Sequence, residues 1–215
     1  MNADNQTAYW DKVAVEKTFS HPLNIHLLSK YIDTTAHITD FGCGYGRLVQ
    51  QLLDAGFINT TGYDTSLQLI NRGRSEEQLP LIHIAMPQDL PLGDESINCI
   101  LLFAVLTCIP SNKGQQELMK LLFSKLKPGG IIYISDYYLQ HNETSRSRYT
   151  YLNDDANNFG VFTLPEGATF RHHTREWIAS LLQDFVINEE HIVEVKTMNG
   201  NHAEAFQLIA SKRAH

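Results

Sequence analysis

Short apolar runs alternate with amphipathic segments over the central part of the chain. In one segment the apolar residues Leu48, Val49, Leu52 and Leu53 recur with the period of a helix, and Gly56 can end it. Residues 97–106 instead form a nearly unbroken apolar run, which is typical of a strand buried on both faces. The pattern predicts strands at His37–Phe41, Thr60–Asp64, Leu81–Ala85, Ile97–Leu106 and Ile131–Tyr137, with helices at Arg47–Ala55, Ser66–Arg74 and Asn112–Leu126.

The regular alternation stops after Tyr137 and returns at Thr174. Between them, residues 138–173 show no regular period and are punctuated by glycine and proline. Thr174 has the character of an N-cap, and it predicts a helix that runs through Leu182. Further strands are predicted at Phe185–Val195 and Ala203–Ala210, and two helices are predicted before the core, at Tyr9–Lys17 and Leu23–Ile32.

Together these elements predict an α/β fold. Alternating strands and helices form parallel sheets, and the final strand can return antiparallel. We therefore expect a three-layer αβα sandwich with a mostly parallel seven-stranded sheet and an antiparallel last strand. The 215 residues suit one domain, divided into an N-terminal helical cap (1–36), a cofactor-binding core (37–137), a substrate lid (138–173) and a C-terminal helix with strands (174–215).

The amino-acid composition limits which kinds of molecule the protein is expected to bind. The net charge is -7, and the 17 basic residues form no dense run, which argues against nucleic acid as the main partner and favours a small molecule. The N-terminal residues are polar and no apolar run approaches membrane-spanning length, so we expect neither export nor a membrane anchor. Cys43, Cys99 and Cys108 form no CxxC pair, as expected for reduced thiols in a cytoplasmic protein, and no metal site is expected. A monomer and a homodimer both remain open.

A glycine-rich loop follows the first predicted strand. Asp40-Phe41-Gly42-Cys43-Gly44-Tyr45-Gly46 brings backbone N–H groups and a helix N-terminus close to a ligand. Its G-x-G-x-G spacing differs from the G-x-G-x-x-G of dinucleotide enzymes, and a plain strand-to-helix turn remains an alternative. Asp64 ends the second strand, where a carboxylate can accept hydrogen bonds from both ribose hydroxyls or can serve the following helix N-terminus.

At this point the chain resembles the class I, Rossmann-like S-adenosylmethionine-dependent methyltransferases. The resemblance runs from about Tyr9 to the C-terminus and includes bacterial small-molecule members of the superfamily. Besides the glycine loop and Tyr63-Asp64, it rests on Leu90-Pro91-Leu92 with Ser96-Ile97-Asn98, which resembles the family's LPF…SFD stretch, and on the LKPGG turn Leu126-Lys127-Pro128-Gly129-Gly130. The fold, the methyl donor and the activity that follow from this resemblance are expectations.

The resemblance also implies which residues bind S-adenosylmethionine. Asp40 would bind the ammonium group, Asp64 the ribose, and Phe103 and Ala104 would line the methyl end. Two positions depart from the family pattern, because Met86 and Asn98 stand where aspartates are common, so adenine recognition would fall to backbone groups near Met86. An aromatic cover from Tyr9 and Phe19 suits a sulfonium, although ordinary helix packing explains such residues equally well. The full predicted set is Tyr9, Phe19, Asp40, Gly42, Cys43, Gly44, Gly46, Tyr63, Asp64, Thr65, Met86, Pro87, Gln88, Phe103 and Ala104.

The predicted lid leaves the sheet edge beside this cofactor, where an acceptor site would be built. Its arginines and tyrosines predict an anionic or hydrogen-bonding, partly aromatic acceptor. His172 or His173 is the candidate general base, because imidazole titrates near neutrality, although a histidine pair before a helix is as often structural. The candidate catalytic set is His172, His173, Glu166 and Tyr137.

The expected reaction is methyl transfer to an oxygen, nitrogen or sulfur atom of a small molecule. A donor-binding protein without turnover and a protein methyltransferase are the alternatives. A nicotinamide oxidoreductase on the same fold is disfavoured by the glycine spacing and the LKPGG turn.

Overall fold

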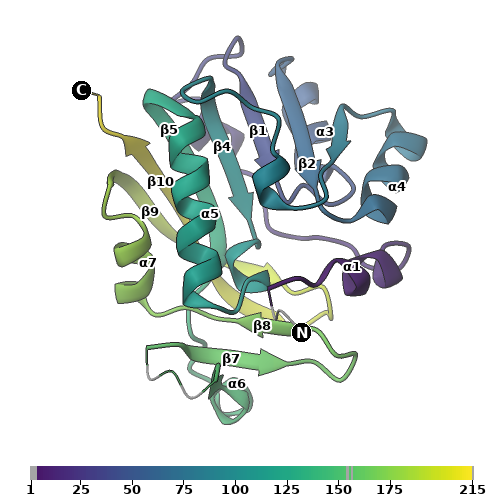
Figure 1. Cartoon of the computed structure of the whole chain (residues 1–215), viewed down its shortest axis with the longest axis vertical. Coiled ribbons are helices and arrows are strands. Elements are labelled where there is room, and N and C mark those ends of the chain that lie inside the picture. Colours follow the sequence, from purple (N-terminus) through teal and green to yellow (C-terminus); the bar gives the residue numbers. More distant parts are fainter. Residues whose placement is uncertain (1–3, 154, 156, 215) are drawn as a thin grey trace.

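The computed structural model describes residues 4–153, 155 and 157–214, and a single large sheet organises them (Figure 1). Its strand order is β3-β2-β1-β4-β5-β10-β9. The five strands β1 to β5 pair in parallel, while β10 runs antiparallel to both β5 and β9. The strands are β1 (Ile38–Phe41), β2 (Thr60–Asp64), β3 (Leu81–His83), β4 (Ile97–Phe103), β5 (Leu126–Tyr137), β9 (Phe185–Lys196) and β10 (His202–Lys212). The predicted seven-stranded, mostly parallel sheet is confirmed.

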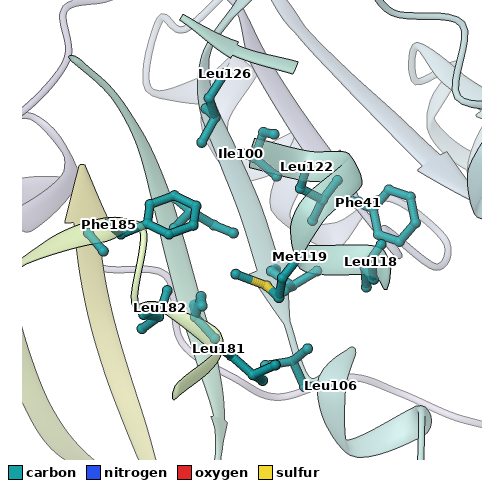
Figure 2. Close-up of a cluster of buried hydrophobic side chains, with 14 of the residues drawn as sticks. Phe41, Ile100, Leu106, Leu118, Met119, Leu122, Leu126, Leu181, Leu182 and Phe185 are labelled. Carbon is teal, nitrogen blue, oxygen red and sulfur yellow. The ribbon is translucent and has the colours of Figure 1, made fainter. Parts of the chain in front are cut away.

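Helices cover both faces of this sheet. On one face, α5 (Asn112–Lys125) and α7 (Arg175–Leu181) pack against it through a cluster that includes Leu118, Leu122 and Phe185 (Figure 2). On the other face, α3 (Arg47–Asp54) buries Leu48 and Leu52. Helix α4 (Leu67–Glu77) packs near β3, and two 3-10 turns lie at Pro87–Asp89 and Leu106–Cys108. These layers confirm the predicted αβα sandwich.

Side-chain caps explain where the longer helices begin. The hydroxyl of Ser66 accepts a hydrogen bond from the third amide of α4, and the hydroxyl of Ser111 does the same for α5. Thr174 caps α7 in the same way, as its sequence position predicts. Each cap satisfies an amide that has no partner within the helix.

The elements that flank the core differ from the prediction in three places. Helix α1 (Thr7–Val13) and helix α2 (Ile25–Leu28) are both shorter than predicted, and α2 begins later because Asn24 adopts an extended conformation and caps it. The LKPGG segment belongs to β5 instead of ending α5 as a separate turn. Its extra residues form a bulge, since Ile97 pairs with Leu126 while Cys99 pairs with Ile131. The first three residues of the predicted cap and the last residue of the predicted C-terminal segment lie outside the described residues.

The stretch predicted to be irregular contains a small second sheet. It comprises β6 (Thr150–Tyr151), β7 (Phe159–Thr163) and β8 (Thr169–Arg171), preceded by α6 (Glu143–Arg148). The three strands pair antiparallel, and they lie beyond the carboxyl ends of the parallel strands, beside α1 (Figure 1). Apart from residues 154 and 156, which lie outside the described residues, residues 138–173 therefore form a structured cover over one edge of the main sheet.

Candidate active site

A cavity of about 840 Å³ lies at the carboxyl edge of the parallel strands. Residues that follow β1, β2, β3 and β4 line it, together with the end of β5, the N-terminal segment and the small sheet. The carboxyl ends of parallel strands are where open α/β sheets bind ligands. This cavity is our candidate active site.

The glycine loop forms one wall of the cavity. Gly42 and Gly44 both have positive φ angles, of 73° and 57°, which side chains rarely tolerate. A Cβ atom at Gly42 would collide with Val105, and one at Gly44 would collide with the ring of Phe19. The loop is held from β2, because Tyr63 O accepts from Gly42 N at 2.8 Å and Asp64 Oδ2 accepts from Gly44 N at 2.8 Å. Packing against Val105 and Phe19 therefore requires glycine at both positions, and both glycines line the cavity.

Two carboxylates stand behind this loop in different environments. Asp40 is buried, and its Oδ2 has no hydrogen-bond partner among the described residues. Burial raises its pKa to about 7, with a further contribution from Asp64, whereas the positive charge of Arg47 opposes the shift. Burial also raises the pKa of Asp64, but the amides of Ser66 and Gly44 stabilise its ionised form. Asp40 therefore offers an unused acceptor to a cation in the cavity.

The part of the cavity assigned to adenine and ribose is built from the ends of β2 and β3. Tyr63, Thr65, Met86, Pro87 and Gln88 all line it. Met86 is 52% exposed, so its side chain is available to a ligand. Phe103 and Ala104 line the cavity where β4 ends.

An aromatic cover closes the glycine-loop side. Phe19 stacks on Tyr45 with ring centroids 5.2 Å apart, and Trp10 contacts Phe19 edge to face at 6.0 Å. Arg72 lies over the other ring of the stack, Tyr45, at 4.1 Å. Tyr9 packs against Trp10 and Phe170 and does not line the cavity, and Gly46 does not line it either but begins α3. The other thirteen predicted cofactor residues do line it.

The opposite end of the cavity is an aromatic and imidazole wall. Tyr137 stacks on His172 at 4.9 Å, while His21 contacts the same tyrosine edge to face at 4.7 Å. The hydroxyl of Tyr149 lies 2.7 Å from Nδ1 of His172. Burial lowers the pKa of His172 well below its usual value, with Arg148, His173 and His21 adding to the shift. Both Tyr137 and His172 thus reach the cavity, as the sequence predicted.

His173 and Glu166 lie elsewhere. The His173 side chain is completely buried outside the cavity, with Nδ1 3.1 Å from the carbonyl of Tyr137 and Nε2 3.0 Å from Gln115 Nε2. It faces away from His172 because consecutive residues of an extended segment point in opposite directions. Glu166 is exposed in the connection between β7 and β8 and does not line the cavity. The structure therefore does not bring these two candidate catalytic residues to the site.

Sequence reasoning missed several residues that line the cavity. His21 was not among the predicted site residues, and Arg47 was predicted only as the first residue of a helix, yet both line the cavity. Arg47 donates to the backbone carbonyl of His21, so the two residues join the N-terminal segment to the glycine loop. Among the described residues, no group of three or more His, Cys, Asp or Glu side chains is arranged to hold a metal ion. Within the same residues, no helix has the length and apolar character needed to cross a membrane.

Comparison with known proteins identifies the family. The family described as "Methyltransferase domain" matches residues 18–185, most of the chain, so the chain belongs to this family. Over 137 residues it is 30% identical to the ribosomal protein L11 methyltransferase of Burkholderia thailandensis, covering 61% of this chain and 43% of that protein. The corresponding protein of Shewanella woodyi is 30% identical over 129 residues, and the chain spans less than half the length of either relative.

Solved structures show the same fold. An S-adenosylmethionine-dependent methyltransferase from Methanosarcina mazei superposes with a TM-score of 0.79 at 24% identity, covering 88% of this chain and 98% of that one. The Burkholderia thailandensis 1,6-didemethyltoxoflavin-N1-methyltransferase, solved with its acceptor and S-adenosylhomocysteine, gives a TM-score of 0.61 at 16% identity, covering 97% and 80%. The chain thus belongs to the methyltransferase-domain family and has the Rossmann-like fold of S-adenosylmethionine-dependent enzymes.

Proposed function

We propose that this chain transfers a methyl group from S-adenosylmethionine to an oxygen, nitrogen or sulfur atom of a small molecule. The observation that carries the proposal is the buried, unpartnered Oδ2 of Asp40 next to a glycine loop whose Gly42 and Gly44 line the same cavity. A sulfonium donor with an amino-acid tail needs both a close backbone surface and a buried acceptor for its ammonium. Family membership supports the same reaction.

The residues of the cavity suit each part of this donor. Asp40 would accept from the ammonium group, and Gly42 with Gly44 would lie along the methionine moiety. Each oxygen of Asp64 already accepts one backbone N–H, from Gly44 or Ser66, and each keeps a second lone pair for a ribose hydroxyl. The donor supplies an electrophilic methyl group, and the protein supplies alignment of the acceptor with it.

The acceptor would occupy the wall formed by Tyr137 and His172. Arg148 lines this region with its guanidinium 3.8 Å over the ring of Phe162, so a positive charge and aromatic faces both border the space. We infer an acceptor that is partly aromatic and carries an anionic or hydrogen-bonding group. Tyr137 and His172 are the candidate residues that would touch it.

A small acceptor is favoured over a protein by the cover on the cavity. The side chain of Gln6 bonds to both the carbonyl and the amide of Thr169, and Trp10 contacts Phe170. The N-terminal segment and the small sheet are therefore joined across the site. A protein acceptor is the second candidate, because the chain is similar in sequence to ribosomal protein L11 methyltransferases.

Calorimetric titration tests the proposal directly. We expect S-adenosylmethionine and S-adenosylhomocysteine to bind and NAD to give no response. Binding of NAD alone would refute methyl transfer. Donor binding without transfer to any member of a small-molecule panel or to ribosomal protein L11 would instead support a binding protein without turnover, and transfer to L11 alone would support a protein acceptor.

A further inference from the structure

One imidazole in the cavity wall has an unused ring nitrogen. His21 lies between α1 and α2, is 5% exposed and lines the cavity. Its Nδ1 is 2.8 Å from the hydroxyl of Ser135, whereas its buried Nε2 has no hydrogen-bond partner among the described residues. Buried polar atoms are normally paired, so an unpaired nitrogen beside a cavity indicates a ligand partner.

The position of Ser135 places His21 between the two halves of the cavity. Ser135 on β5 is in register with Phe103 at the end of β4, and its carbonyl accepts from Ala104 N at 2.7 Å. Phe103 and Ala104 border the methyl end of the proposed donor site. On its other side, His21 contacts Tyr137 of the acceptor wall. His21 therefore stands where donor and acceptor would meet.

The charges around His21 favour a neutral ring. Burial lowers the pKa of His21 to about 4, and the positive charge of Arg47 on α3 adds to the shift. The other titratable groups nearby are Tyr137 on β5 and His172, whose own pKa values are raised and lowered respectively by burial. A bare nitrogen facing the cavity also suits a cationic donor better than an N–H would. Ser135 can accept from Nδ1–H and so keep Nε2 unprotonated.

We propose that Nε2 of His21 accepts the proton of the incoming nucleophile, so that the acceptor is a ring-bearing small molecule whose O–H or N–H group is methylated. This inference rests on the methyl transfer proposed above. The O–H or N–H bond of the acceptor breaks and its proton forms an N–H bond with Nε2. The lone pair left on oxygen or nitrogen bonds the methyl carbon, and the carbon–sulfur bond breaks with its electron pair on sulfur.

The charge balance of this step supports the assignment. The positive charge on the sulfonium disappears when the methyl group leaves, and an imidazolium of equal charge forms on His21. The net charge of the cavity is unchanged, so Asp40 and Arg47 face the same total charge before and after transfer. His172 is less suited to the role because, unlike His21, it has no buried ring nitrogen that lacks a hydrogen-bond partner among the described residues.

The tautomer of His21 gives a test that needs no known acceptor. Nitrogen NMR of histidine-labelled protein, with and without S-adenosylhomocysteine, locates the ring protons, and His21→Gln assigns the signals. We expect a neutral ring with hydrogen on Nδ1 and a bare Nε2 from about pH 6 to 8. Ser135→Ala should shift the population toward the other tautomer, a change that a purely structural role for Ser135 would not cause. Hydrogen on Nε2, or an imidazolium, would overturn the proposal.

Transfer assays on phenols, N–H heterocycles and thiols complete the test. We expect His21→Gln to lower kcat on O–H and N–H acceptors by about 100-fold or more, because a general base contributes rates of that order. Methylation of a thiolate needs no base, so the kcat of the variant on thiol acceptors should fall little. Its affinity for S-adenosylhomocysteine should stay near that of the wild type. His26→Gln, on the exposed face of α2, is the matched control.

The remaining outcomes separate the two proposals. If His21→Gln lowers kcat on thiols as much as on O–H and N–H acceptors, or if it weakens the binding of S-adenosylhomocysteine, His21 acts in donor binding. Either result would overturn its role as proton acceptor. If the wild type binds no S-adenosylhomocysteine, the proposed function fails, while the tautomer in the free protein still tests His21. If none of the acceptors in the assay is methylated, the tautomer of His21 measured by NMR decides whether the proposal holds.

Discussion

Asp40 and Asp64 end or follow neighbouring strands, yet their oxygens are used differently. Asp64 holds the glycine loop through Gly44 and the start of α4 through Ser66. Asp40 leaves Oδ2 unpaired in a buried position, where ionisation is unfavourable until a cation arrives. One carboxylate therefore organises the site in advance, and the other responds to the ligand.

The Asp64→Ala variant should bind S-adenosylhomocysteine more weakly by about 10- to 100-fold, because hydrogen bonds to a charged group contribute about 1.5–3 kcal/mol each. Titration calorimetry measures the change. Asp54→Asn provides a control, since Asp54 is exposed on α3 and accepts a hydrogen bond from the neighbouring Gln50 side chain. Equal affinities of Asp64→Ala and wild type would exclude a role in donor binding.

The affinity for the same ligand should depend on pH through Asp40. Its pKa of about 7 means that below this pH the carboxyl group must release a proton before it can bind an ammonium group. Affinity should therefore fall as the pH drops below 7, by up to about tenfold per pH unit, and Asp40 should contribute no dependence above it. In Asp40→Asn we expect weaker binding without this dependence. A flat profile in the wild type would contradict the assignment.

Local sequence was enough to predict which strand-end residues line the cavity, whereas their roles in donor binding remain a prediction. Gly42, Gly44 and Asp64 sit where a parallel sheet gathers its carboxyl ends. His21 and Arg47 could not be assigned in this way. Their place in the cavity depends on a contact between the N-terminal segment and α3, which no spacing in the chain reveals.

At the scale of elements, a single side chain joins the N-terminal segment to the small sheet. Gln6 donates to the carbonyls of Cys108 and Thr169 and accepts from the amide of Thr169, so it pairs with β8 as another strand would. The helix that follows, α1, carries Trp10, which contacts Phe19, and Phe19 in turn packs against Gly44 of the glycine loop. Opening the cavity therefore requires these bonds to break.

Gln6→Ala should increase hydrogen exchange at the amides of residues 7–13 and 169–171, because the cover then opens more often. Exchange in β1 and β4 should stay as in the wild type. The control is Gln50→Ala, which removes an exposed amide that bonds within α3. Unchanged exchange at 169–171 in Gln6→Ala would show that the aromatic contacts hold the cover without it.

The central strands of the main sheet were predictable because β4 and β5 carry long, almost continuously buried apolar runs. The strands β6 and β8 are only two and three residues long, too short for an alternating pattern to register. The LKPGG segment misled the prediction because proline and glycine normally end elements, whereas here they form a bulge in β5.

At the scale of the whole molecule, buried imidazoles link stability to pH. Burial and the charge of Arg171 lower the pKa of His173 to about 3, so the folded chain keeps this ring neutral. The unfolded chain takes up the proton near pH 6.5, and stability is lost as the pH falls below that value. Asp40 and Asp136, whose pKa values burial raises to about 7, act in the opposite direction.

The contribution of His173 is therefore measured by plotting the free energy of unfolding against pH and comparing the slope of the variant with that of the wild type. In His173→Gln, the fall in the free energy of unfolding between about pH 6 and 4 should be shallower by up to about 1.4 kcal/mol per pH unit, whatever the starting stability. Denaturant titrations at several pH values give the slopes. His26→Gln should keep the wild-type slope, and a His173→Gln slope equal to wild type would show that the ring is protonated when folded.

The placement of β10 between β5 and β9 makes the outer strand dependent on its neighbour. Strand β9 pairs with β10, and β10 in turn pairs with β5. Because β9 reaches the parallel strands only through β10, β9 cannot keep its place in the sheet once β10 has left it. The turn between these two strands, with Met198 and Asn199, lines the cavity, so loss of β10 from the sheet would also remove part of the cavity wall.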